Sequence, residues 1–210
     1  MSKIYLKELN QALRQCGIGI DYIKIDATPS FAVFHSHAWD HGYDGIKISP
    51  DGGINKDSVF SETRRQFYAD MNEMMRFLLK YFSSKNIEEL IIAPCHQYYQ
   101  FTYDVDKREQ NDIYSEIYAF LRKNDVRKNQ RSGIRITLEE NIEQVEMIVE
   151  GAFRGVTELC LFAPTQRILL APDHHFGITF FTQNKAAEKE CILKLLEKFQ
   201  TLSLYDEDDK

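Results

Sequence analysis

Two short turns, each flanked by segments rich in β-forming residues, constrain the fold of this chain more than any other feature. The turns are ATPS at residues 27–30 and APTQ at residues 163–166, and the predicted strands beside them are residues 18–26, 31–36, 159–162 and 168–171. Proline, threonine and serine favour turns, and connections this short join strands that run antiparallel. A third strand follows each pair, at residues 46–49 and 176–182. The sequence therefore predicts two three-stranded meanders.

Long amphipathic helices separate and follow these meanders. The longest predicted helix covers residues 61–82, with apolar residues at helical spacing such as Phe67, Met71, Leu78 and Phe82. Further helices are predicted near residues 2–16, 113–121, 142–149 and 184–200, and further strands at residues 90–93, 96–103 and 134–137. This pattern predicts a single α+β domain over residues 1–210, with an antiparallel-rich sheet and long helices packed on one face.

Capping residues predict where several helices begin and end. Ser2 is expected to cap the first helix and Gly17 to end it as a C′ glycine. Thr137 followed by Glu140 matches a capping box, and Asn184 is expected to cap the last helix. Beyond that helix, residues 205–210 form an acidic end that is expected to fray.

The composition limits both compartment and partners. The net charge is −6, which disfavours non-specific nucleic-acid binding and suits a small molecule or a basic protein partner. No signal peptide or membrane-spanning run is predicted. The four cysteines form no C-x-x-C pair, which indicates buried free thiols in a reducing cytoplasm: Cys16, Cys95, Cys160 and Cys191.

Residues 31–45, FAVFHSHAWDHGYDG, concentrate the side chains that could carry chemistry. On a strand, His35 and His37 point the same way and could present two imidazoles to zinc or another divalent metal. Asp40 and His41 could add ligands or a general base. The pattern resembles the His-x-His-x-Asp-His signature of metallo-β-lactamase-like hydrolases, but Trp39 is inserted before the aspartate. The plainer interpretation is a polar loop at a strand end.

The same stretch is also a candidate protein-binding surface. Trp39, Asp40, Tyr43 and Asp44 combine aromatic and acidic side chains, and Trp and Tyr are enriched at interface hot spots. No Walker loop or dinucleotide glycine fingerprint is present, so an enzymatic interpretation depends on the histidines alone. Basic residues gather only near positions 122–135, which makes nucleic acid a minor option.

The two meanders resemble each other in sequence. Residues 23–37 align with residues 159–173, and Ala27 then falls opposite Ala163. In this alignment, the cluster that begins at His35 falls opposite the Asp-His-His turn that begins at Asp173. The sequence thus predicts an internal repeat of residues 18–82 and 157–202.

A second resemblance concerns the C-terminal unit. A hairpin with the turn at residues 163–166, the segment APDHHFG at residues 171–177, an outgoing strand and a helix at residues 184–200 resemble the immunity proteins that neutralise bacterial polymorphic toxins. The resemblance implies a non-enzymatic, cytoplasmic inhibitor without a cofactor, which occludes a cognate and basic toxin. Charge complementarity would steer that encounter. The residues expected to bind the toxin are Trp39, Asp40, Tyr43, Asp44, Asp173, His174 and His175. The metal-dependent hydrolase is the alternative.

Overall fold

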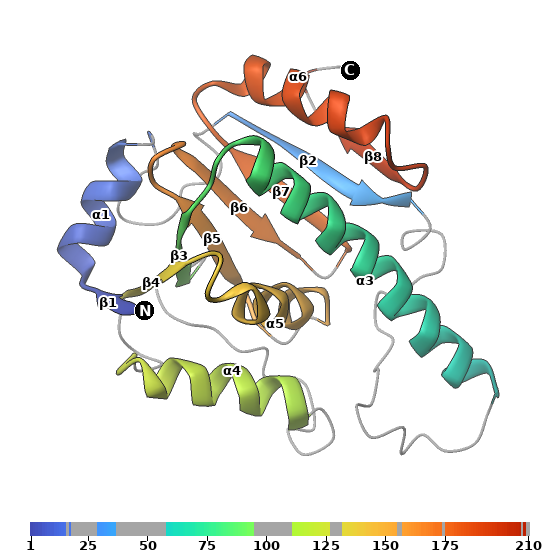
Figure 1. Ribbon diagram of the computed structural model, residues 1–210, viewed down its shortest axis with the longest axis horizontal. Helices are drawn as coiled ribbons and strands as arrows, with labels where there is room; N and C mark the ends of the chain where they lie inside the picture. Colours follow the sequence, from blue (N-terminus) through green and yellow to red (C-terminus); the bar gives the residue numbers. More distant parts are fainter. Residues whose placement is uncertain are drawn as a thin grey trace.

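The computed structural model describes residues 1–15, 17, 29–36, 58–94, 111–126, 132–154, 157–173, 175–206 and 208. Within these residues, helices cover both faces of an eight-stranded sheet (Figure 1). The strands are β1 (Ser2–Ile4), β2 (Ser30–His35), β3 (Glu89–Pro94), β4 (Gly133–Thr137), β5 (Leu159–Ala163), β6 (Ile168–Pro172), β7 (Gly177–Phe181) and β8 (Leu202–Tyr205). The helices are α1 (Leu6–Gln15), α3 (Ser58–Ser84), α4 (Asn111–Lys123), α5 (Ile142–Phe153) and α6 (Lys185–Leu196).

Every neighbouring pair of strands in this sheet is antiparallel, which confirms the predicted α+β class. The order is β1-β4-β3-β5-β6-β7-β2-β8. The predicted C-terminal meander is present as β5-β6-β7. Its first turn includes Arg167 in the left-handed region, at φ 57°. Both edge strands, β1 and β8, are short, which limits unwanted pairing with other chains.

The first predicted meander is tested only through its middle strand, β2. That strand lies between β7 and β8, with Val33 opposite both Ile178 and Leu204. Both hydrogen-bonding edges of β2 are thus occupied, so the prediction that it is the middle strand of a meander with residues 18–26 and 46–49 is wrong. The predicted strands at residues 18–26, 46–49 and 96–103 lie outside the described residues. The repeat of residues 18–82 and 157–202 therefore stays a prediction.

The two faces of the sheet carry different helices. On one face, α3, α4, α5 and α6 enclose the larger core, in which Phe67, Met74, Phe77, Leu78 and Tyr81 of α3 are all almost fully buried. This confirms the long helices on one face. The shorter α1 packs Leu9 and Leu13 against the opposite face, over residues such as Ile91, Cys160 and Phe162.

Two helices begin later than predicted because the residues expected to cap them are paired in strands. Ser2 belongs to β1 and lies opposite Arg135, so α1 begins only at Leu6. Thr137 is paired with Glu89 as the last residue of β4, and Asn141 is the N-cap of α5 instead. The predicted helix end at Gly17, with φ 76°, is confirmed. Asn184 is at the predicted N-cap position of α6, but its side chain forms no capping hydrogen bond.

The predicted free thiol is confirmed for Cys191, which is half-buried rather than buried, and is wrong for Cys160. Cys191 is a free thiol, whereas Cys160 is disulfide-bonded. Because disulfides are uncommon in reducing compartments, the cysteines no longer support a cytoplasmic location. None of the described helices has the length and apolar character needed to cross a membrane.

The expected fraying of residues 205–210 is wrong for Asp206, while residues 207, 209 and 210 lie outside the described residues. Asp206, directly after β8, is buried and accepts hydrogen bonds from Lys185 at 2.5 Å and Lys189 at 2.6 Å. Burial alone would raise the pKa of this carboxyl, but the two lysines outweigh that effect and hold the pKa at about 2. The ion pairs therefore fasten the chain after β8 to the first turn of α6.

Replacing Asp206 with Asn should lower the free energy of unfolding at pH 7 by about 2 kcal/mol, since both lysines lose a charged partner. A depressed pKa contributes stability that is present above the unfolded value and lost as the pH falls through the folded value. The difference between the two proteins in urea denaturation should therefore shrink from about pH 4 to about pH 2. Glu190→Gln, at an exposed carboxylate of the same helix, is the control and should change little. A difference that is independent of pH would contradict the ion-pair account.

Candidate functional site

The two sequence stretches that contain the His and Asp clusters meet at one end of the sheet. Because β2 and β7 are antiparallel, the end of β2 lies beside the start of β7, with Phe34 opposite Gly177. The His35 N–H donates to the Phe176 carbonyl at 3.1 Å. The structure therefore brings the backbone of His35 next to the turn that begins at Asp173.

The turn from Asp173 to Gly177 is tightly held. The Asp173 carboxylate accepts from the His175 backbone N–H at 2.8 Å, and the Asp173 N–H donates to the Gly177 carbonyl at 3.0 Å. Phe176 is in the left-handed region, at φ 57°, which is uncommon for a bulky residue. Its ring is fully buried and stacks on Phe153 at 4.5 Å, so core packing fixes this conformation. The half-buried Asp173 and the exposed His175 are thus presented on a rigid support.

His35 lies in a buried polar network rather than at the surface. Its side chain is fully buried, and its Nε2 atom is 3.3 Å from Glu73 Oε2 and 3.7 Å from Asp70 Oδ1. Gln66 donates to Asp70 at 2.6 Å, and the Thr201 hydroxyl donates to Glu73. The network joins β2, α3 and the segment before β8, which satisfies polar groups that would be costly to bury alone.

The metal hypothesis gains no support from this geometry. Of its four ligands, only His35 lies among the described residues; His37, Asp40 and His41 lie outside them. Within the part of the chain that the structure describes, no group of three or more His, Cys, Asp or Glu residues could hold a metal ion. Of the residues expected to bind a toxin, Trp39, Asp40, Tyr43, Asp44 and His174 also lie outside the described residues.

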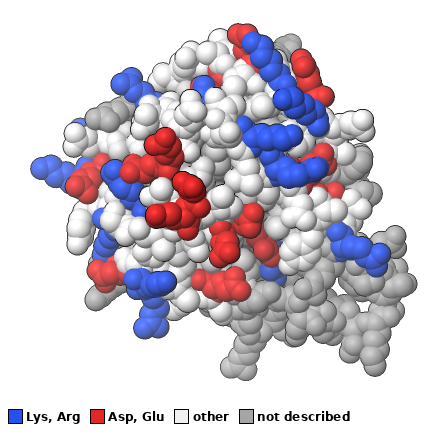
Figure 2. Space-filling model, viewed as in Figure 1, with Lys and Arg blue, Asp and Glu red and all other residues white. Residues whose placement is uncertain are grey.

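A second candidate surface is an acidic stripe on α5 and the turn before it. We define the acidic stripe as Glu139, Glu140, Glu143 and Glu146, all of which are exposed. Figure 2 shows acidic side chains gathered over α5 on this face. Among the described residues, no cation pairs with these four glutamates. By contrast, Glu150 in the last turn of the helix accepts from Arg154 and from Tyr68, both at 3.0 Å.

The acidic stripe is absent from the sequence prediction, although a signal for it exists. The glutamates recur at intervals of three and four residues, and residues 136–153 include no Lys or Arg. That spacing places carboxylates on one side of a helix. The apolar residues Val145, Ile148 and Val149 occupy the opposite side and are buried.

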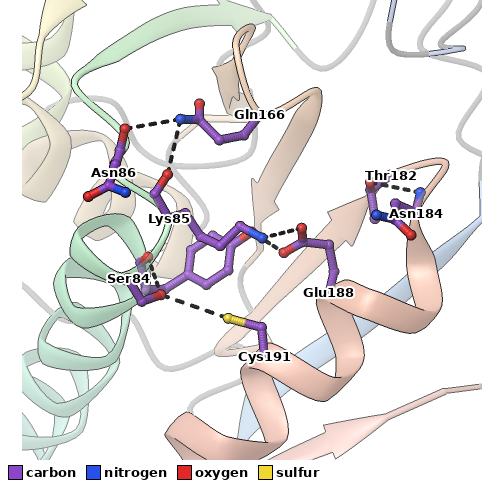
Figure 3. Close-up of polar contacts among 9 residues, drawn as sticks. Ser84, Lys85, Asn86, Gln166, Thr182, Asn184, Glu188 and Cys191 are labelled. Carbon is purple, nitrogen blue, oxygen red and sulfur yellow. Dashed lines mark hydrogen bonds and ion pairs between the residues drawn. The ribbon is translucent and has the colours of Figure 1, made fainter.

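Two polar contacts and one close helix packing hold the helix layer that includes α5. Between α3 and α6, Lys85 donates to the nearly buried Glu188 at 2.6 Å, and the two side chains face each other in Figure 3. The Tyr81 hydroxyl donates to the same carboxylate at 3.0 Å, and burial together with Glu188 raises the pKa of Tyr81. Between α4 and α5, a Cβ on Gly151 would lie 2.4 Å from the Ile117 side chain, so these helices pack very closely.

Comparison with protein families, curated proteins and solved structures found no match to this chain. The functional argument therefore depends on the geometry and charge of the chain itself.

Replacing His35 with Leu should lower the free energy of unfolding by about 2 kcal/mol, because Glu73 and Asp70 would lose a polar partner. His35→Gln can still donate toward Glu73 and should lose clearly less stability, as measured by urea denaturation. The hydrolase interpretation expects a different result. A chelator would lower the unfolding midpoint of the wild-type protein, and His35→Gln would abolish that effect.

Proposed function

We propose that this chain is a non-enzymatic binding module of the immunity type, which occludes a basic protein toxin in the bacterial cytoplasm. The acidic stripe is the observation that carries the proposal. Four exposed carboxylates without cationic partners among the described residues create a local negative potential over α5. A basic partner would be attracted to this patch before contact, which speeds association.

The rigidity of the helix layer favours binding in the same way. α5 is buried along one side and packs closely on α4 at Gly151, so its carboxylates are displayed on a fixed support. A partner that binds a rigid surface pays little entropy to order it. Asp173 and His175 add a second rigid polar element at the end of the sheet.

The experiment begins with the product of the neighbouring upstream gene, if that gene encodes a toxin-like protein. The purified pair should form a complex, and the complex should abolish the toxin's activity. If the neighbouring genes encode metabolic enzymes and no protein partner is captured, the proposal loses its basis and the metal-dependent hydrolase is favoured.

Reversing two charges of the acidic stripe should weaken that complex. We expect Glu143→Lys combined with Glu146→Lys to slow association at least tenfold at low salt, with a smaller effect at high salt, because rim charges act mainly on the association rate. Surface plasmon resonance measures both rates. Glu8→Lys is the matched control, since Glu8 is an exposed glutamate of α1 on the opposite side of the sheet. Equal effects of the two changes would contradict a role for the stripe.

Trp39→Ala tests the aromatic half of the expected surface. Truncation of a buried interface anchor commonly costs on the order of 2 kcal/mol, and this loss is seen mainly as faster dissociation. The variant should therefore weaken the complex about thirtyfold through its dissociation rate. An unchanged dissociation rate would exclude Trp39 as an anchor.

A further inference from the structure

The face that carries the acidic stripe also carries a basic band. We define the basic band as the exposed cations Arg65, Arg76, Lys80, Lys194 and Lys198 of α3 and of the α6 end. Figure 2 shows basic side chains over α3 and α6 beside the acidic ones over α5. Within the described part of the chain, Arg65, Lys80 and Lys198 form no ion pair. Arg76 and Lys194 pair with Glu73 and Glu190, so the charge of the band is neutralised locally only in part.

We propose that this face binds a second copy of the chain, with the acidic stripe of each copy against the basic band of the other. Two patches of opposite charge that lie side by side on one face are self-complementary. A two-fold axis that passes midway between the patches brings each acidic stripe opposite a basic band, and both contacts form at once. This inference does not depend on the proposed toxin.

The packing of the face makes such a contact geometrically specific. α3 lies between α5 and α6. Tyr68 of α3 donates a hydrogen bond to Glu150 of α5, and Lys85, directly after α3, donates one to Glu188 of α6. These half-buried contacts therefore fix the spacing between the two patches. Lys80 also lies over the Phe199 ring at 5.0 Å, which holds one cation of the band in place.

The interaction should be weak and sensitive to salt. Exposed ion pairs each contribute little, and the net charge of −6 opposes association. Screening lengths fall from roughly 20 Å at low salt to about 8 Å at physiological salt. The dimer should therefore be at least tenfold weaker at physiological salt than at low salt.

A charge-swap experiment with the full chain tests the proposal. One variant combines Lys80→Glu with Lys198→Glu, and the other combines Glu143→Lys with Glu146→Lys. In sedimentation equilibrium at low salt, the wild-type chain should dimerise, and each variant alone should be monomeric because like charges would then face each other. An equimolar mixture of the two variants should dimerise at least as tightly as the wild type. Glu8→Lys should behave like the wild type.

Several outcomes would overturn the inference. These are a monomeric wild type at the highest soluble concentration, a mixture that does not associate, or one variant that still dimerises alone. The variant with Glu143→Lys and Glu146→Lys has a smaller net negative charge than the wild type. Repulsion between the net charges of two copies therefore cannot explain why this variant fails to dimerise. The first variant leaves the acidic stripe intact and should still bind a toxin. Failure of the dimer and failure of the proposed function are therefore distinguishable.

Discussion

The pairing of β2 between β7 and β8 is the constraint on which the rest of this structure depends. A strand from the first part of the sequence is hydrogen-bonded on both sides to strands from the last part. Phe31 and Val33 then face the larger core, and Phe31 stacks on Phe180 of β7 at 5.3 Å. Without β2, the sheet would end at β7, and neither β8 nor the His35 network would have a support.

The same pairing explains the arrangement of polar groups. The end of β2 and the start of β7 lie at the same end of the sheet because the two strands are antiparallel. His35 and the turn at Asp173 are therefore neighbours although they are far apart in the sequence. The core side of this end is closed by Phe176, whose carbonyl accepts from the His35 N–H. The charged surfaces lie elsewhere, on the outer sides of α3, α5 and α6. Polar groups inside the protein therefore hold the fold together, and those outside remain available to partners.

The fold was largely predictable because its signals are local. Short turns determine strand direction, and the apolar residues of α3 recur at helical spacing over many turns. The errors arose where pairing between distant segments decided the outcome. Ser2 and Thr137 match capping patterns, but β4 pairs with β1 and β3 and takes both residues into strands. In the sequence, Asp206 belongs to an acidic end, but in the fold it is buried and forms ion pairs with two lysines of α6.

The candidate site was less predictable for the same reason. His35 was predicted as a metal ligand, whereas its observed partners Asp70 and Glu73 belong to a helix whose position cannot be derived from sequence spacing. The acidic stripe could have been read from the glutamate spacing, whereas its proximity to the basic band depends on how α3 packs on α5.

The position of β8 also bears on how the protein is made. Ribosomes release the chain from its N-terminus, so β2 emerges early and must wait for β7 and β8, its two hydrogen-bonded neighbours. Contacts between such distant segments slow folding, and an unpaired strand exposed in the meantime invites aggregation. During synthesis, we therefore expect β2 to depend on chaperones for protection until β8 has been added.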